Sequence, residues 1–503
     1  MTNRLKRIFS LLTALILAFS LSSCSVKNTT GTTAGGASSM TLPLAEENAP
    51  LAPYGDKEDS EVYRASIYYA SSDGSVSVPS TRVLWLSSAS SIHRRLAEEL
   101  MKTPGSDANA VVQRGSRIAS VENSGNIVTV NVLPAGSMSD AEIKTLTDAM
   151  SKTMFELPSV TGVTVLLSGR AASFSDLPIG LITKNTDVSI LYDEAVHYEE
   201  SEHTSVSRRI SAYYPSIDET CVIPCEMTVS HEPADPAKAI LRALGTLPNQ
   251  SGVIQGVPGC ENMFEKVSRY EITPDGEQIL HIFLTSDAFL ALNQSGHDRH
   301  MYLASIVLTL TSFLADTDGV CLSIGGKTVT EVPVKNGAAR KFPSGIMRRE
   351  DFAPYIGKHV SLYFANENNM LEEEIRALPL ASADSARARI CALIEGPESS
   401  NLLPIFPLGV KASDILGIDI SGSVVSVNLS ANVYRMAQSF SQSEEELFVF
   451  GLINTLSELR GVSGLRLYFE GVTGSVLTHK IYLEGVILKN PGRIQTPESS
   501  ASN

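Results

Sequence analysis

The sequence predicts a mixed α/β protein in which one unit of order β-β-α-β-β-α-β occurs three times. An apolar, aromatic strand opens each unit, at residues 66–69, 189–192 and 361–364. Each unit has a hairpin in its middle with a turn of small or polar residues, and each closes with a helix followed by a glycine-bounded strand. Strands mixed with two helices favour a sheet that carries its helices on one face.

The first half of each unit contains a second strand and a helix. The second strand is clear at residues 83–86 and 227–229 and weak at 375–380. The helices, predicted over 92–101, from Pro236 to before Pro248, and over about 385–394, carry apolar residues at helical spacing. Asp235 stands as an N-cap before a proline at the first helical position. Glycine and proline end these helices, because one permits the left-handed cap and the other cannot continue the hydrogen-bond ladder.

The second half of each unit is a hairpin, a helix and a strand. The hairpin strands are predicted at 118–121 with 127–133, 267–272 with 279–284, and 415–420 with 424–429. The helices follow at 140–155, 300–314 and 444–459, and the closing strands at 163–167, 320–324 and 465–469. A glycine precedes each closing strand, at Gly162, Gly319 and Gly464. The middle unit is longer, and its polar residues 198–219 are predicted to form an inserted loop.

These patterns predict six segments along the chain. They are a signal segment at 1–23, a flexible tether at 24–60, units at 61–183, 184–345 and 357–490, and a disordered tail at 491–503. The tether is rich in Thr, Ser, Gly and Ala, so as a coil it would span roughly 30–35 Å.

The first 24 residues resemble the leader of a bacterial lipoprotein. Basic residues at 4, 6 and 7 precede an apolar stretch of about 14 residues, too short for a membrane-spanning helix but of the length of a signal-peptide core. Leu21-Ser22-Ser23-Cys24 is similar to the lipobox, which implies cleavage before Cys24 and acylation of its thiol. The expected location is the outer face of the cell membrane, with the bilayer bound through lipidated Cys24. A plain secretory signal with a chance cysteine is the alternative.

The composition of the chain limits the classes of binding partner that it can have. The chain has 503 residues and a formal net charge of −15, from 55 acidic and 40 basic residues. An acidic surface repels phosphate backbones, so no nucleic-acid partner is expected. No later segment has 18 consecutive apolar residues, so no other span of a membrane is expected.

Five cysteines remain beside Cys24: Cys221, Cys225, Cys260, Cys321 and Cys391. Disulfides are permitted outside the membrane, but sequence cannot assign their pairing. The spacing of Cys221 and Cys225 allows a metal site, although no second pair follows at zinc-ribbon spacing. Buried free thiols, disulfides and a metal site therefore stay open, with free thiols favoured.

Three further patterns hint at chemistry, and each has a structural alternative. Gly325-Gly326-Lys327-Thr328 resembles the end of a phosphate loop but lacks the first glycine, which favours a turn. His297 and His300 offer two metal ligands without a third, in what looks like a lead-in to a helix. Tyr68-Tyr69 and Tyr363-Phe364 suit sugar stacking, yet such pairs more often alternate between core and surface. No catalytic motif, cofactor or metal is expected.

The repeated pattern resembles the GerMN domain of sporulation and spore-germination proteins. The match rests on the helix stop at residues 392–397, on return strands such as 427–430, and on the second helix with its closing turn, best at 306–311 and 454–456. The first unit departs most, because its second helix has Asp148-Ala149-Met150 and lacks the Thr-Leu pair. The resemblance covers residues 62 to about 490. It implies a fold akin to ring-building motifs and frequent lipidation, and it does not imply catalysis.

Two classes of function follow. The first is a non-catalytic scaffold of the cell envelope, linked to sporulation or germination, that binds envelope or sporulation-complex proteins and assembles as a ring or another homo-oligomer. The second is a lipoprotein that binds a wall glycan or peptide, which predicts a concave site with converging polar groups. A wall-modifying enzyme is a weaker third class, because it would need acidic or histidine residues gathered from different units.

Overall fold

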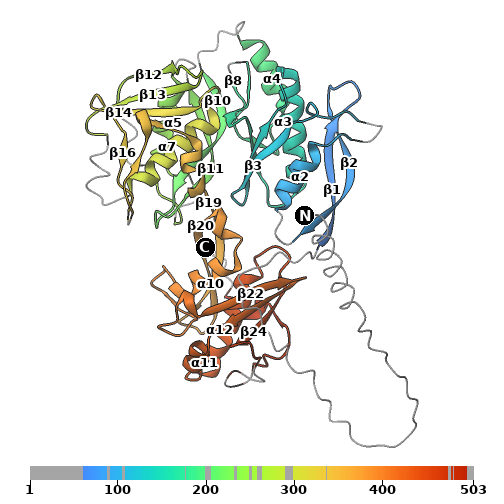
Figure 1. Ribbon diagram of the computed structural model, residues 1–503, viewed down its shortest axis with the longest axis vertical. Coiled ribbons are helices and arrows are strands. Elements are labelled where there is room, and N and C mark those ends of the chain that lie inside the picture. Colours follow the sequence, from blue (N-terminus) through green and yellow to red (C-terminus); the bar gives the residue numbers. More distant parts are fainter. Residues whose placement is uncertain are drawn as a thin grey trace, which may run out of the picture. The chain divides into compact units, whose positions relative to one another are not determined.

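The computed structural model describes residues 60–87, 91–104, 108–175, 177–198, 205–231, 235–248, 252–257, 263–288, 298–335, 337–473, 477, 479 and 481–495. These residues contain the predicted order of elements three times (Figure 1). We call the three copies repeats 1, 2 and 3. The predicted signal segment, Cys24 and all but the last residue of the tether lie outside the described residues.

Repeat 1 consists of a hairpin, a helix, a three-stranded core sheet and a helix that crosses over it. In order these are β1 (Ser60–Ala70), β2 (Ser77–Ser87), α2 (Ile92–Leu100), β3 (Arg117–Asn123), β4 (Ile127–Leu133), α3 (Asp140–Phe155) and β5 (Gly162–Leu167). Strand β4 pairs antiparallel with β3 and parallel with β5, and α3 makes the crossover that a parallel pair requires. The repeat ends with β6 (Arg170–Ala171), β7 (Ser173–Phe174), β8 (Leu177–Pro178), β9 (Ile182–Thr183) and α4 (Val188–Val196).

Repeat 2 has the same order and the same pairing. Its elements are β10 (Val206–Pro215), β11 (Val222–His231), α5 (Pro236–Leu244), β12 (Phe264–Ile272), β13 (Gln278–Leu284), α7 (Arg299–Phe313) and β14 (Gly319–Ile324). Asp235 caps α5 by accepting a hydrogen bond from the backbone N–H of Lys238, as the sequence predicts. The repeat ends with β15 (Lys327–Thr328), β16 (Glu331–Val332), β17 (Arg340–Lys341), a 3-10 turn (Pro343–Gly345), β18 (Ile346–Met347), α8 (Arg349–Phe352) and a second 3-10 turn (Ala353–Tyr355).

Repeat 3 follows the same plan with one added helix. Its elements are β19 (Gly357–Asn366), β20 (Leu371–Pro379), α9 (Leu380–Ala383), α10 (Ala386–Glu395), β21 (Leu402–Leu403), a 3-10 turn (Ala412–Asp414), β22 (Ile415–Ser421), β23 (Val424–Leu429), α11 (Ala431–Ala437), α12 (Gln442–Leu456), β24 (Gly464–Phe469), β25 (Ile487–Leu488) and a 3-10 turn (Pro491–Arg493). Strand β20, weak in the sequence, pairs with β19 over nine residues of each strand.

The predicted opening strand of repeat 2 is wrong. Residues 189–192 lie in helix α4, which begins where the Asp187 side chain accepts a hydrogen bond from the N–H of Ser189. Helix α4 packs on the core of repeat 1, where Tyr192 meets Phe174 edge to face. The true opening strand is β10, inside the segment predicted as an inserted loop at 198–219. Its residues 211–214, Ser-Ala-Tyr-Tyr, match Ser-Ile-Tyr-Tyr at 66–69, so repeat 2 begins after α4.

The predicted disordered tail also starts too early. Residues 491–495 are ordered against repeat 3, because Ile494 bridges to Leu371 and the N–H of Gln495 donates to the carbonyl of Leu371 at 2.7 Å. Of the predicted tail at 491–503, residues 496–503 lie outside the described part.

One hydrogen bond ties the opening strand to the second helix in every repeat. The backbone N–H groups of Tyr68, Tyr213 and Tyr363 donate to the hydroxyls of Thr153, Thr309 and Thr455, at 3.1, 2.9 and 3.0 Å. A helix lying beside the strand cannot supply a backbone partner, so the threonine hydroxyl satisfies the N–H. Repeat 1, which lacks the Thr-Leu pair, therefore still has the equivalent threonine at Thr153. Met154 follows it where the other two repeats have leucine.

Replacing Thr455 by valine is expected to lower the free energy of unfolding by about 1–3 kcal/mol, because the buried N–H of Tyr363 loses its acceptor. Urea unfolding of the two proteins measures this difference. Thr455→Ser keeps the hydroxyl and should retain most of the stability. An equal loss in both variants would mean that the methyl group, and not the hydrogen bond, matters.

A glycine opens each closing strand because a short returning segment packs against that position and leaves no room for a side chain. A Cβ on Gly162, Gly319 or Gly464 would lie 2.8, 3.0 and 2.4 Å from side-chain atoms of Leu181, Ile346 and Val486. These three residues belong to corresponding segments, at or next to β9, β18 and β25, which pair antiparallel with β5, β14 and β24.

Helix α7 is buried on all sides, from His300 to Phe313. A helix that is buried all round must be covered on every face. Within repeat 2 it packs on β10 and β14, and it also contacts β6 of repeat 1. Helix α3, its counterpart in repeat 1, keeps an exposed polar side.

Candidate functional site

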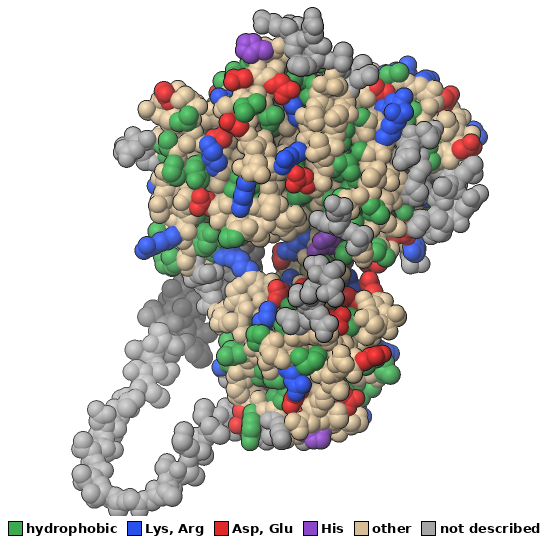
Figure 2. All heavy atoms as spheres, turned by 180° about the vertical axis from the view of Figure 1, so that it is seen from behind, with side chains coloured by type: hydrophobic (Ala, Val, Ile, Leu, Met, Phe, Trp, Pro, Cys, Tyr) green, Lys and Arg blue, Asp and Glu red, His purple; other side chains and the backbone are tan. Residues whose placement is uncertain are grey.

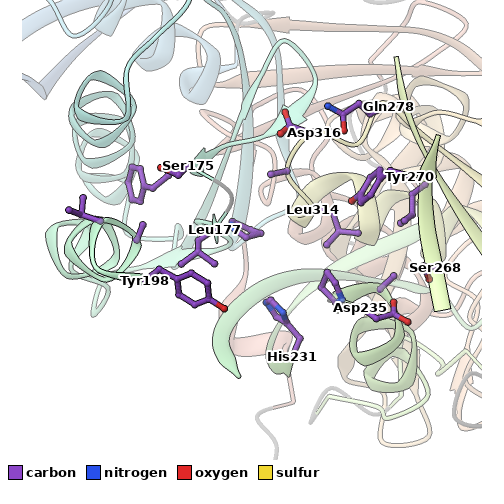
Figure 3. Close-up of a pocket in the computed structure, with 18 residues that line it drawn as sticks. Ser175, Leu177, Tyr198, His231, Asp235, Ser268, Tyr270, Gln278, Leu314 and Asp316 are labelled. Carbon is purple, nitrogen blue, oxygen red and sulfur yellow. The ribbon is translucent and has the colours of Figure 1, made fainter. Parts of the chain in front are cut away.

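A cavity of about 750 Å³ lies where the end of repeat 1 meets repeat 2 (Figure 3). Repeat 1 contributes β7, β8 and the end of α4, and repeat 2 contributes the start of α5, the inner side of β12 and the residues after α7. Leu177 and Leu314 line its middle, while Asp316 with Gln278 and His231 with Asp235 lie toward its two ends (Figure 3). The sequence did not indicate this site, because its residues come from two repeats.

The fold already uses most of the polar groups that line the cavity. The Asp235 side chain caps α5, and the Tyr270 hydroxyl lies 3.0 Å from that of Thr317. Asp316 pairs with Arg170 at 3.5 Å, and the His231 ring meets Phe313 edge to face. Burial raises the pKa of Tyr270, so its phenol stays protonated at neutral pH. The cavity can therefore hold a ligand by apolar contact, with few polar groups left to orient one.

The cysteines predicted as thiols, disulfides or metal ligands are thiols that form no disulfide at the four described positions. Cys221, Cys225 and Cys321 are buried and Cys391 is half-buried, whereas Cys260 lies outside the described residues. Burial raises the pKa of Cys221 and of Cys225 to about 12, so both thiols stay protonated. Within the described part of the chain, no three His, Cys, Asp or Glu side chains are placed to hold a metal ion.

The other predicted patterns have structural roles. Gly325 and Gly326 form the tight turn between β14 and β15 with φ of 52° and 77°, which agrees with the turn interpretation. Tyr69 and Phe364 are fully buried, whereas Tyr68 is only partly buried, so the aromatic pairs belong mainly to the core.

Of the predicted histidine pair, only His300 lies in the described residues. Asp298 caps helix α7 by accepting a hydrogen bond from the N–H of His300 at 2.8 Å. The His300 ring is fully buried between Phe352 and Tyr355, with ring centroids 5.1 and 4.7 Å away. Burial lowers the pKa of His300 to about 4, so the imidazole is neutral near pH 7.

This burial makes stability fall in acid. The unfolded chain takes up a proton on His300 below about pH 6.5, but the folded chain does so only below about pH 4, so stability is lost as pH falls between these values. Moving from pH 7 to pH 5 is expected to cost on the order of 2 kcal/mol from this group. Urea unfolding at both pH values measures the cost, and His300→Phe should make it smaller. An unchanged pH dependence in that variant would contradict the assignment.

Among the described residues, no helix is long and apolar enough to cross a membrane. Acidic and basic side chains are interspersed over the face in Figure 2, without a field of one sign.

The fold thus defines a class, a protein of three repeated ββαββαβ domains. Two stretches of the sequence, residues 66–173 and 361–474, match the Germane family, described as sporulation and spore germination. These stretches lie in repeats 1 and 3, so the resemblance to the GerMN domain is confirmed for them. Repeat 2 has the same topology but differs at one position of the closing turn. In repeats 1 and 3, Asn131 and Asn428 accept a hydrogen bond from the turn glycine, and Phe283 stands at the equivalent position of repeat 2.

Solved structures that are similar to this chain include GerMN domains of a sporulation protein and a putative lipoprotein. The tandem GerMN domains of the sporulation protein GerM from Bacillus subtilis share 18% identity, over 58% of this chain and 99% of that one, with a TM-score of 0.23. A putative lipoprotein from Clostridium perfringens shares 22% identity, over 26% of this chain and 88% of that one, with a TM-score of 0.19. No curated protein matches this chain.

Proposed function

We propose that this protein is a lipid-anchored, non-catalytic scaffold on the outer face of the cell membrane, which binds envelope proteins during sporulation or germination. The observation that carries the proposal is that buried and partly buried polar groups join repeat 1 to repeat 2. Arg170 of repeat 1 makes two hydrogen bonds to Asp318 of repeat 2, at 2.6 and 2.7 Å. Arg349, after β18, reaches Glu122 of repeat 1, and Thr164 meets Ser211 at 2.9 Å.

A scaffold needs domains held in a defined relation, and these contacts serve that need. Buried hydrogen bonds between charged groups have strict geometry, so they favour one docking of repeat 1 on repeat 2. Groups that would serve catalysis, such as His300 and Asp298, instead hold a helix in the core.

The anchor is tested by replacing Cys24. In Cys24→Ser the thiol that accepts the lipid is absent, so an uncleaved precursor without lipid is expected. Metabolic labelling with a fatty-acid analogue should mark the natural protein and not the variant. Label on the variant would overturn the anchor.

The scaffold role is tested by purifying the protein from crosslinked cells, during growth and during sporulation. Recovery of envelope or sporulation-complex proteins would support the scaffold and name its partner. Recovery of wall fragments without proteins would overturn it.

Binding of a wall glycan or peptide is the second candidate. The cavity of about 750 Å³ favours an apolar part of a wall peptide over a sugar, because few of its polar groups are left to orient hydroxyls. In that case Leu314→Trp, which fills the middle of the cavity, should abolish recovery of wall fragments. A scaffold would keep its protein partners in the same variant.

A further inference from the structure

The surface that docks repeat 1 on repeat 2 has exposed counterparts at the two ends of the folded chain. We call residues 177–183 the tail of repeat 1 and residues 482–488 the tail of repeat 3. The two tails correspond, because Thr183 pairs with Gly162 as Leu488 pairs with Gly464. Both tails also contain the sequence Gly-aliphatic-Ile, at 180–182 and 485–487.

Inside the chain, the tail of repeat 1 docks on the edge of strand β10. The N–H of Leu181 donates to the carbonyl of Arg209 at 2.8 Å, and the Arg208 guanidinium donates to the carbonyl of Pro178 at 3.0 Å. The Arg209 side chain also donates to the hydroxyl of Thr183 at 2.9 Å. This docking buries Leu177, Leu181 and Thr183, which are at most 6% exposed.

No described residue covers the tail of repeat 3 in this way. Its residues at the equivalent positions, Tyr482, Val486 and Leu488, are between 39% and 73% exposed. A Cβ on Gly485 would meet nothing within 4 Å, whereas a Cβ on the equivalent Gly180 would lie 2.3 Å from the carbonyl oxygen of Arg209. The same segment is thus covered in one repeat and apolar but open in the other.

The opening hairpin of repeat 1, β1 and β2, exposes the surface on which a tail docks in repeat 2. Aligning Ser66 with Ser211 places Arg64 at the position of Arg209, on the strand edge where a tail would dock. The outward face there carries Val62, Val83 and Trp85, which are between 50% and 62% exposed, and Val62 lies opposite Trp85. We call this surface the end face.

The two open surfaces match each other in chemistry. At the internal contact, Thr183 faces Arg209, whose neighbour across the hairpin is Thr228. At the ends of the chain both threonines are replaced by apolar residues, Leu488 in the tail and Val83 opposite Arg64. Where the contact between repeats 1 and 2 is polar, the tail of repeat 3 and the end face therefore both present apolar side chains.

We propose that the tail of repeat 3 in one copy docks on the end face of a second copy, head to tail. The contact repeats the internal one, with the N–H of Val486 donating to the carbonyl of Arg64. Each copy then keeps one open tail and one open end face, so the contact is heterologous and further copies can add. This inference builds on the proposed scaffold function by naming one partner, and the proposed lipid anchor would raise the effective concentration of the copies on a membrane.

A photo-crosslinking amino acid at position 488 of the full-length chain tests this in membranes that carry the protein. We expect a crosslinked pair of copies whose linked peptide, identified by mass spectrometry, includes the end face. Val83→Glu with Trp85→Glu in the receiving copy should lower the yield about tenfold or more, because a buried carboxylate would face apolar side chains. Thr228→Glu with Ser230→Glu, at the equivalent positions of repeat 2, should leave the yield unchanged.

Mixing two variants tests the direction of the contact. One copy carries the altered end face, and the other carries Val486→Glu with Leu488→Glu and the crosslinker at position 85. Each variant alone should give no crosslinked pair, and the mixture should give pairs but nothing larger. Because all these side chains are exposed in the single copy, unchanged thermal unfolding verifies the fold.

Crosslinking to another protein alone, or pairs that persist with the altered end face, would overturn the inference. The proposed function has a separate readout, the partners recovered from crosslinked cells. Absence of paired copies together with recovery of envelope proteins would reject self-association and leave the scaffold in place.

Discussion

Replacing Arg349 by alanine is expected to lower the free energy of unfolding by about 3–5 kcal/mol, the largest effect of any single charged residue considered. The Arg349 guanidinium is buried and donates to Glu122, to the Tyr213 hydroxyl at 3.1 Å and to the Ser312 hydroxyl at 2.6 Å. Burial alone would lower the pKa of Arg349, but the negative charge of Glu122 and these hydrogen bonds raise it. Removing the arginine leaves a largely buried carboxylate without its cation.

Urea unfolding measures the loss, and Arg340→Ala provides the control. Arg340 pairs with Asp351 at 3.2 Å, but both side chains are about one-third exposed, so its loss should cost at most about 1 kcal/mol. Arg349→Lys should recover little, because an ammonium group cannot reproduce the guanidinium geometry. Equal effects of Arg349→Ala and Arg340→Ala would contradict the claim that this buried group couples the repeats.

Gly180→Ala is expected to cost about 2–4 kcal/mol, because it combines overpacking with backbone strain. Gly180 has φ of 78°, a conformation that favours glycine, and a Cβ there would lie 2.3 Å from the carbonyl oxygen of Arg209. The tail of repeat 1 would have to move off β10 and would lose the hydrogen bond from Leu181.

Gly169→Ala separates the cost of overpacking from the cost of backbone strain. Gly169 has a similar φ of 87°, but a Cβ there would meet nothing within 4 Å. Only the strain of about 1 kcal/mol should remain in this variant. If both alanine variants lose the same stability, the contact between the tail and β10 contributes nothing.

Local patterns predicted most of the elements. The periodicity of apolar residues, the Asp235-Pro236 helix start and the glycine-bounded turns place the two main helices and the core-sheet strands of each repeat within a few residues of their observed bounds. The strands of the opening hairpins are longer than predicted, as β1 and β2 show. Such signals are contained in short stretches of chain, where the spacing of apolar residues and the turn chemistry act directly.

The wrong predictions fall in segments whose secondary structure depends on tertiary contacts. The apolar run at 189–192 resembles a strand, but it follows a capping aspartate and is held as a helix by the core of repeat 1. Strand β10 looked polar because its exposed positions carry Arg209 and Ser207, while its other face is buried under α7. Which face of a segment meets which helix is not contained in the segment itself.

The candidate surfaces were missed for the same reason. The returning strands β9, β18 and β25 are two residues long, too short for any periodicity. The repeated glycine followed by two aliphatic or Met residues, at 180–182, 345–347 and 485–487, is the signal that could have found them. The residues of the cavity and of the end face are distant in sequence. They come together only when the strands pair in the folded protein.

The most direct test of the account is hydrogen exchange of two backbone amides, Leu181 and Val486, in the full-length protein at low and high concentration. We expect the Leu181 amide to be protected throughout, because its acceptor on Arg209 lies in the same chain. The Val486 amide should exchange quickly in single copies and become protected only when copies associate. Rapid exchange at Leu181, or a Val486 amide that exchanges equally fast at every concentration, would contradict the account.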